Sequence, residues 1–196
     1  MHRRLAAIGF FLCLVAPWST ASAQTASGQT NERLWTLLRN GGQVVLMRHA
    51  ITTPGAGDPA GMRLDDCSTQ RNLIDEGRGH ARRIGDEFRA RGVNVGAVLA
   101  SPWCRCIETA RLAFGTAEAW QPLANLFGRS ENESKQIAEL RKFVGQKRPA
   151  NVALVSHGST IAALTGVSLG TGEMVIVTPQ GSGEFAVIGR LSVPPS

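Results

Sequence analysis

The sequence contains no tyrosine, and aromatic residues make up only 6% of its 196 positions. Proteins that bind nucleic acid usually combine a basic surface with aromatic side chains that stack on the bases. Here the arginines are scattered along the chain, and no basic stripe is interleaved with aromatic residues. Nucleic acid is therefore not an expected partner, and the formal net charge of +6 favours a small anionic molecule or a glycolipid.

Long apolar runs are also scarce. One run, LAAIGFFLCLVAPW over residues 5–18, follows a basic start and is short for a membrane-spanning helix. It precedes Ala21-Ser22-Ala23, which is typical of a signal peptidase site. We therefore predict a signal peptide over residues 1–23 that is removed, a flexible leader over residues 24–30, and a periplasmic or secreted mature protein. An uncleaved membrane anchor is the alternative, and no stable membrane span is expected after signal removal.

Cysteine is rare, and three of the four cysteines follow the predicted signal peptide. Cys104 and Cys106 flank one arginine of a predicted helix and cannot easily pair with each other, so the expected disulfide joins Cys67 to either of them. An odd count in an exported protein leaves one thiol free or paired between chains. The sequence has no second cysteine pair, histidine cluster or acidic cluster at ligand spacing, so no metal or other cofactor is expected.

About 170 residues remain after the signal peptide, enough for the one domain that we predict over residues 31–196. Apolar segments that read as strands alternate with amphipathic segments that read as helices, and the last two strands form a hairpin. The predicted strands cover residues 43–47, 95–101, 151–156, 172–179 and 183–193. The predicted helices cover residues 30–42, 75–92, 102–114, 130–146 and 157–166. This alternation predicts an α/β three-layer sandwich, with helices flanking a mostly parallel central sheet and an antiparallel pair at its edge.

Four arginine and histidine side chains follow the ends of predicted strands. Arg48 and His49 come after VVLM, Arg105 lies just inside the helix after VLAS, and His157 comes after ALVS. Because open α/β sheets bind ligands beyond the carboxyl ends of their strands, we expect these side chains to share one pocket. Guanidinium groups bind phosphate oxygens, and a neutral imidazole can attack phosphorus. The pattern therefore predicts phosphoryl transfer to a histidine, with the arginines and a protonated second histidine stabilising the charge that develops.

The motifs LMRHA, SPWCRCIETA and LVSHGST, in this order, resemble the histidine phosphatase superfamily, also called phosphoglycerate mutase-like. The resemblance runs from the first predicted strand to the C-terminus. It implies His49 as the phosphorylated nucleophile, Arg48 and Arg105 as phosphate ligands, and His157 as the second histidine, with Thr52 also near the phosphate. The signal peptide and the segments RHA, TQRNL and SPWCR look most similar to the periplasmic lipopolysaccharide core heptose(II)-phosphate phosphatase group. That similarity implies a phosphorylated envelope sugar as substrate.

Two positions depart from the pattern of the superfamily. Ala50 stands where the first motif has Gly, and the expected proton donor is missing. The mutase-like branch has a Glu in the region that reads PLANLFGR here, and another branch has an acid where this chain has Ser159. Four other acidic residues could donate the proton, and the sequence does not rank them: Asp58, Asp66, Glu131 and Glu173. Without a donor the chain could be a non-catalytic phosphate-binding or regulatory member of the same fold.

Several alternative interpretations remain. Arg105 could form a surface ion pair with Glu108 or Glu87, and the long Gly/Pro-rich loop over residues 52–66 could be a mobile connection or a lid. His80 is expected on an exposed helix surface. A phosphatase for phosphohistidine or phosphotyrosine in proteins is disfavoured by export, and the oligomeric state stays open. The sequence thus predicts an exported, metal-independent phosphomonoesterase acting through a phosphohistidine.

Overall fold

The computed structural model describes residues 31–128, 131 and 133–195. The predicted signal peptide and leader, residues 1–30, lie outside the described residues. Within the described part, no helix is both long and apolar enough to cross a membrane.

A six-stranded sheet forms the centre of the fold, in the order β3-β2-β4-β1-β5-β6. The strands are β1 (Val44–Arg48), β2 (Val95–Ala100), β3 (Glu118–Ala119), β4 (Asn151–Ser156), β5 (Met174–Gly181) and β6 (Glu184–Leu191). The first four strands of this order pair in parallel, whereas β5 pairs antiparallel with both β1 and β6. The mostly parallel sheet and its antiparallel edge are therefore confirmed. Strand β3 was not predicted, because two exposed residues are too few to show the alternation of apolar and polar residues that indicates a strand.

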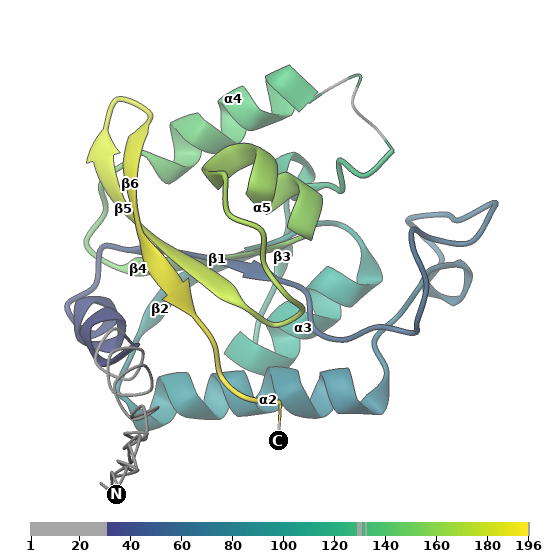
Figure 1. Cartoon of the computed structure of the whole chain (residues 1–196), viewed down its shortest axis with the longest axis horizontal. Helices are drawn as coiled ribbons and strands as arrows, with labels where there is room; N and C mark the ends of the chain where they lie inside the picture. The colour runs from purple at the N-terminus through teal and green to yellow at the C-terminus, as the bar shows by residue number, and fades with distance from the viewer. Residues whose placement is uncertain (1–30, 129–130, 132, 196) are drawn as a thin grey trace, which may run out of the picture.

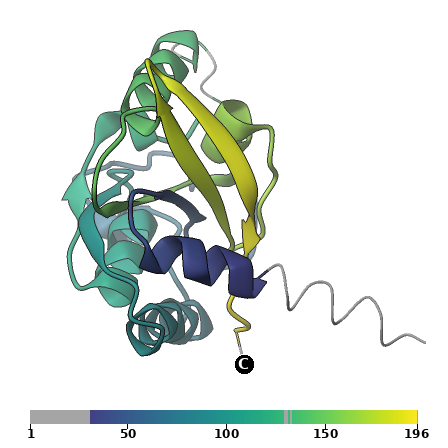
Figure 2. The same cartoon turned by 90° about the vertical axis from the view of Figure 1, so that its left-hand side faces the viewer.

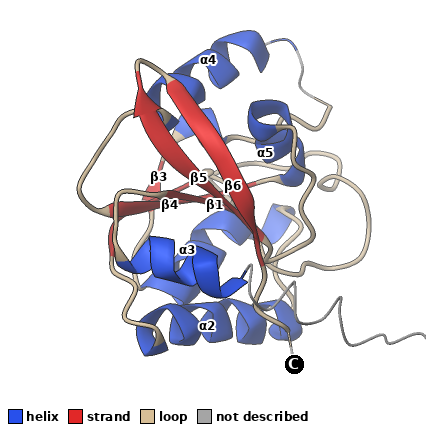
Figure 3. Ribbon diagram, turned by 60° about the vertical axis from the view of Figure 1, so that its left-hand side comes forward, coloured by secondary structure: helices blue, strands red, loops and turns tan. Residues whose placement is uncertain are grey.

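Helices cover both faces of the sheet. After the helix that ends at residue 39, they are α2 (Asp75–Ala90), α3 (Cys104–Phe114), α4 (Glu133–Val144) and α5 (Gly158–Thr165), with short 3₁₀ turns η1 (Cys67–Thr69) and η2 (Gln121–Leu123). Figures 1 and 3 show α4 and α5 on one side of the sheet and α2 and α3 on the other. Figure 2 shows the helix of residues 31–39, in purple, on the side of α2 and α3. The predicted three-layer sandwich is thus confirmed.

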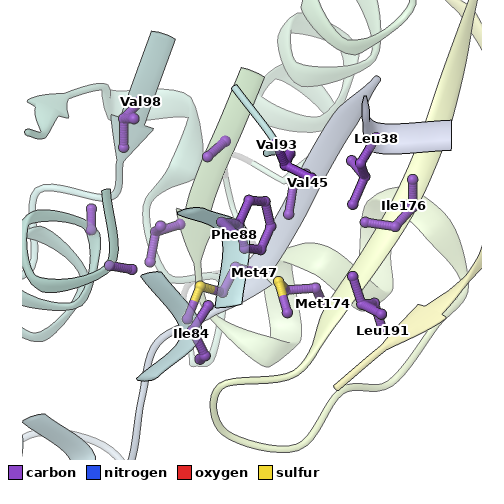
Figure 4. Packing of buried hydrophobic residues seen from close by; sticks show 14 of the residues in the cluster. Leu38, Val45, Met47, Ile84, Phe88, Val93, Val98, Met174, Ile176 and Leu191 are labelled. Carbon is purple, nitrogen blue, oxygen red and sulfur yellow. The ribbon is translucent and has the colours of Figure 1, made fainter. Parts of the chain in front are cut away.

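Two apolar clusters, one on each face, hold the layers together. Val45 and Met47 of β1 pack in the same cluster as Ile84 of α2 (Figure 4), whereas Val44 and Leu46 lie in the cluster of α4 and α5. Successive strand residues point to opposite faces, so a strand covered on both faces is apolar throughout. This explains why VVLM reads as a continuous apolar run and why β1 is central.

His80 of α2 corrects an expectation, because it is buried rather than exposed. Its Nε2 lies 2.7 Å from the carbonyl oxygen of Val193, which belongs to the C-terminal segment. Figure 1 shows this segment running down from β6 to α2. A helical pattern cannot reveal that a distant terminus covers one of its polar positions.

A disulfide joins Cys67 of η1 to Cys104, the first residue of α3. Cys106 is buried and free, so the structure selects one of the two pairings that the sequence allowed. The Cys104 backbone N–H also donates to the side-chain oxygen of Gln70, at 2.9 Å. The long loop after β1, which projects on the right of Figure 1, is thereby fastened to the start of α3.

Candidate active site

Hydrogen bonds between segments far apart in the sequence fix the backbone of the predicted motifs. The His49 N–H donates to the Ser156 carbonyl at 2.9 Å, which extends the pairing of β1 with β4. The Thr109 hydroxyl accepts from the Ala50 N–H at 3.1 Å and donates to the Arg105 carbonyl at 2.7 Å. One side chain of α3 thus ties the first motif to the second.

The four predicted strand-end side chains lie together in one cavity of about 510 Å³. Arg48, His49, Arg105 and His157 all line it, at the carboxyl edge of the parallel strands. Further segments also line it: Gly55, Ala56 and Gly57 of the loop, Arg71 before α2, Asn125 and Phe127 after η2, Gly158, Ser159 and Ala162 of α5, and Ser168 and Leu169 after α5. The loop over residues 52–66 is therefore a wall of this cavity.

Thr52 does not line the cavity. It is buried and forms an isolated antiparallel bridge with Leu73, beside the start of α2. The structure therefore places Thr52 outside the wall of the cavity.

His49 is held in one tautomer by the backbone. Its Nδ1 lies 2.8 Å from the Ala50 carbonyl oxygen. Because a carbonyl only accepts hydrogen bonds, Nδ1 carries the proton and Nε2 keeps a lone pair. Burial lowers the pKa of His49 to about 3; the Ala50 hydrogen bond opposes this shift, and the positive charges of Arg105, Arg48 and Arg71 add to it. The imidazole is therefore neutral, as a nucleophile must be.

His157 is neutral as well, with the opposite tautomer. Its Nε2 lies 2.8 Å from the Ser101 hydroxyl, and its Nδ1 lies 3.5 Å from Nη2 of Arg105, which can only donate. Nε2 therefore carries the proton. Burial is the main cause that holds the pKa of His157 well below its usual range, and His49 and the arginines contribute. The rings of His49 and His157 meet edge to face, with centroids 5.5 Å apart.

Three arginines line this cavity, and each has a guanidinium nitrogen without a hydrogen-bond partner in the described part of the chain. Nη1 of Arg48 donates to the Leu169 carbonyl at 2.7 Å, and Nη1 of Arg71 donates to the Gly55 carbonyl at 2.9 Å. The Nε atoms of Arg48, Arg71 and Arg105 are all buried and have no hydrogen-bond partner among the described residues. Buried donors are normally paired, and guanidinium donors prefer anionic oxygens. The cavity can therefore bind an anion with several negatively charged oxygens.

Arg105 is 1% exposed and forms an ion pair with Asp58, whose nearest oxygen lies 2.6 Å from Nη1. The alternative of a helix-surface pair was wrong, because Glu108 pairs with Arg78 and Glu87 with Arg91. Burial alone would raise the pKa of Asp58, but hydrogen bonds from Arg105, the Arg71 backbone and Trp103 outweigh it and lower the pKa.

None of the four candidate proton donors lines the cavity. Asp66 accepts hydrogen bonds from the backbone and hydroxyl of Ser68, and Glu173 accepts from the Gly170 N–H. Glu131 lines a neighbouring cavity instead. Asp58 is the one of the four whose carboxylate accepts hydrogen bonds from a predicted site residue, Arg105; Glu173 contacts Arg48 through its backbone carbonyl, which accepts from the Arg48 N–H at 3.0 Å.

Sequence reasoning missed Arg71 as a third arginine of the cavity. Its signal was present, because Arg71 stands in the TQRNL segment whose similarity had been noted without assigning a role to the residue. Ser159 and Asn125 were also missed as wall residues; the Ser159 hydroxyl donates to the Asn125 side-chain oxygen at 2.9 Å. Both stand at positions where only a missing acid had been noticed.

The two buried neutral histidines predict a pH-dependent stability. The unfolded chain binds protons at His49 and His157 near pH 6.5, but the folded chain does not, so the free energy of unfolding falls as the pH drops below about 6.5. Each histidine contributes up to about 1.4 kcal/mol per pH unit in this range. Urea unfolding of the parent and of His49→Gln at several pH values from 7 to about 4 measures the two slopes, and we expect the variant to have the shallower one. Equal slopes would contradict the buried neutral state of His49.

No protein-family model matches the chain, and no curated protein matches its sequence. Solved structures do match. The protein histidine phosphatase SixA complexed with tungstate aligns with a TM-score of 0.55 and 21% identity, over 76% of this chain and 96% of that chain. A mycobacterial glucosyl-3-phosphoglycerate phosphatase aligns with a TM-score of 0.55 and 16% identity, over 75% of this chain and 97% of that chain. A phosphoserine phosphatase from Entamoeba histolytica, in complex with 3-phosphoglyceric acid, aligns with a TM-score of 0.53 and 15% identity, over 78% and 98%.

At these identities the likeness concerns the fold, and the aligned proteins are covered over nearly their whole length. Each of them is a phosphatase, and the first is by its name a histidine phosphatase. The α/β architecture predicted from the sequence is the one they share. This chain therefore has the α/β fold that these phosphatases share, the phosphoglycerate mutase-like fold.

Proposed function

We propose that this protein is a phosphomonoesterase that acts through a phosphohistidine at His49. The observation that carries the proposal is the tautomer of His49, whose lone pair on Nε2 belongs to a neutral imidazole in a cavity with three arginines. Neutral imidazole attacks phosphorus, and guanidinium groups bind the charged oxygens around it. The shared fold with solved phosphatases supports the same reading.

The reaction has two steps. In the first, Nε2 of His49 forms a bond to phosphorus while the bond from phosphorus to the ester oxygen breaks, and the departing oxygen takes a proton from solvent water. In the second, water attacks phosphorus, the bond to His49 breaks, and inorganic phosphate leaves. Arg48, Arg71 and Arg105 stabilise the equatorial oxygens in both steps. Binding of the dianion raises the pKa of His157, so that this residue can carry a proton toward the phosphoryl group.

The arginines supply the positive charge that metal ions supply in other phosphatases, so we propose a metal-independent reaction. Three guanidinium groups lie at one cavity, and only Arg105 is paired with a carboxylate there. A chelator is accordingly expected to leave turnover unchanged.

For the substrate we propose a phosphorylated sugar of the cell envelope, which an exported enzyme could reach. The similarity of the predicted signal peptide and of the motif sequences to the heptose(II)-phosphate phosphatase group supports this proposal. A second cavity of about 530 Å³, which shares Asn125 with the first, supports it as well. Trp120 lies in its wall beside polar side chains, among them Gln121, Lys135 and Gln136. An amphipathic aromatic ring beside several hydrogen-bonding groups suits a hydroxylated ring. The leaving group of a phosphosugar could extend into this second cavity.

A second candidate function is a phosphate-binding module without turnover. The observation in its favour is that no candidate proton donor lines the cavity. An alkoxide leaving group departs slowly without a proton donor, although an aryl oxide does not need one.

The test uses residues 24–196 with an aryl phosphate at mildly acidic pH, with and without EDTA. We expect turnover that EDTA does not change, followed by turnover of sugar phosphates. Binding of inorganic phosphate without turnover would assign the chain to the second candidate function. Turnover that EDTA removes would contradict the metal-independent mechanism.

A further inference from the structure

Hydrogen-bond donors from three residues, Arg71, Trp103 and Arg105, occupy both oxygens of the Asp58 carboxylate. Its Oδ1 accepts from Nη1 of Arg105 at 2.6 Å and from the Arg71 backbone N–H at 3.1 Å. Its Oδ2 accepts from Nη2 of Arg105 at 3.1 Å and from Nε1 of Trp103 at 3.0 Å. Each oxygen thus accepts two hydrogen bonds, which suits an ionised carboxylate. A proton on either oxygen would meet only other donors, with no acceptor to receive it.

The contact uses one particular edge of the Arg105 guanidinium. Asp58 occupies the end formed by Nη1 and Nη2, so the side edge formed by Nε and Nη2 remains. Nε is buried without a partner in the described part of the chain, and Nη2 also lies 3.5 Å from Nδ1 of His157. Nη2 therefore faces the second histidine. A planar guanidinium held at its end by a bidentate carboxylate has a fixed orientation, so Asp58 also fixes the contact of Arg105 with His157.

Burial makes this arrangement important. Arg105 is 1% exposed, and the Asp58 side chain is 9% exposed, so water solvates neither charge to any large extent. Beside Arg48 and Arg71, a third unpaired guanidinium would be repelled and costly to bury. Asp58 neutralises it and defines its orientation, although Asp58 itself does not line the cavity.

We propose that Asp58 is the positioning residue of Arg105, fixing its guanidinium beside His157 at the wall of the cavity, and is not the proton donor. This inference rests on the proposed phosphatase function. It also gives the loop over residues 52–66 a specific task, because that loop carries Asp58 into the site.

The first experiment compares Asp58→Asn with the parent on an aryl phosphate and on an alkyl phosphate. A positioning residue orients a phosphate ligand and does not protonate the leaving group, so its effect does not depend on which ester is used. We therefore expect kcat/KM to fall by about 10- to 100-fold, and by the same factor on both esters. Loss confined to the alkyl ester would identify Asp58 as a proton donor and overturn the proposal. Asp65→Asn is the matched control: Asp65 lies in the same loop, pairs with Arg63 at the surface, and is expected to leave kcat/KM unchanged.

The second experiment repeats the substitution in an Arg105→Ala background. Because Asp58 acts through Arg105, we expect Asp58→Asn to cause no further loss there. An equal loss in both backgrounds would show that Asp58 acts independently and would overturn the proposal. Trp103→Phe keeps the ring but removes the Nε1–H donor, so it should give a smaller loss with the same dependence on Arg105. This variant carries the test if Asp58→Asn does not fold.

Failure of the proposed function can be told apart from failure of this inference. If the parent turns over neither ester, the phosphatase proposal fails, and affinity for inorganic phosphate becomes the readout. The positioning role then requires that Asp58→Asn weakens phosphate binding in the parent and leaves it unchanged in the Arg105→Ala background.

Discussion

Replacing His49 by alanine is expected to lower turnover of an aryl phosphate by about 10⁴-fold or more. The substitution removes the only atom that we expect to bond to phosphorus, whereas the arginines that bind the anion remain in place. The variant should still bind inorganic phosphate. Rapid acid and alkaline quenching of the parent during turnover should reveal a phosphoryl adduct that is stable to alkali and labile to acid, and the variant should form none.

A histidine outside the cavity provides the control for this prediction. His80 is buried on α2 and hydrogen-bonds to the Val193 carbonyl, and glutamine at this position can keep that bond. His80→Gln should form the phosphoryl adduct as the parent does. An adduct that persists in His49→Ala would place the nucleophile elsewhere and would falsify the role of His49.

Removing the disulfide by Cys67→Ser is expected to lower the free energy of unfolding by about 4 kcal/mol, the loss of chain entropy restriction for a loop of this length. The two cysteines are separated by 37 positions, and the segment between them contains Arg71, all of α2 and all of β2. Urea unfolding of the parent and the variant under oxidising conditions measures the difference. We also expect turnover to fall, because Cys104 lies beside Arg105 at the start of α3.

A reducing agent supplies the control for the disulfide prediction. It should destabilise the parent by a similar amount and leave the variant unchanged. Cys106 is a free thiol in both proteins, so it cannot account for a difference between them. If the reduced and oxidised parent unfold at the same urea concentration, the disulfide does not stabilise the fold.

The central strands could be predicted because burial on both faces makes them apolar throughout. VVLM of β1 and NVALVS of β4 carry this signal, and their carboxyl ends already indicated where Arg48, His49 and His157 would meet. Strand β3 could not be predicted, since its two residues are exposed and owe their conformation to β2. The burial of His80 was equally hidden, because the C-terminal segment that covers it is far away in the sequence.

The site residues that directly follow a strand end could be predicted from the sequence. Those that a loop brings back to the cavity were missed. Arg71 reaches the cavity because the chain returns to it after η1, and no periodic pattern of apolar residues in the sequence predicts the path of such a loop. Asp58 was one of four candidate acids because sequence shows which residues are acidic but not what they contact. Its pairing with Arg105 depends on a separation of 47 positions along the chain.

The register of β1 against β4 has a consequence for how this protein acquires activity. The bond between the Gln43 N–H and the Asn151 side chain, at the start of that pairing, spans 108 positions. The two histidines can therefore meet only after β4 has been made and has paired with β1, and contacts of such long range form slowly. A truncated or half-assembled chain has no means of holding both. If the proposed function holds, activity therefore reports that β1 and β4 have paired, and the cavity cannot transfer phosphoryl groups before this part of the sheet has formed.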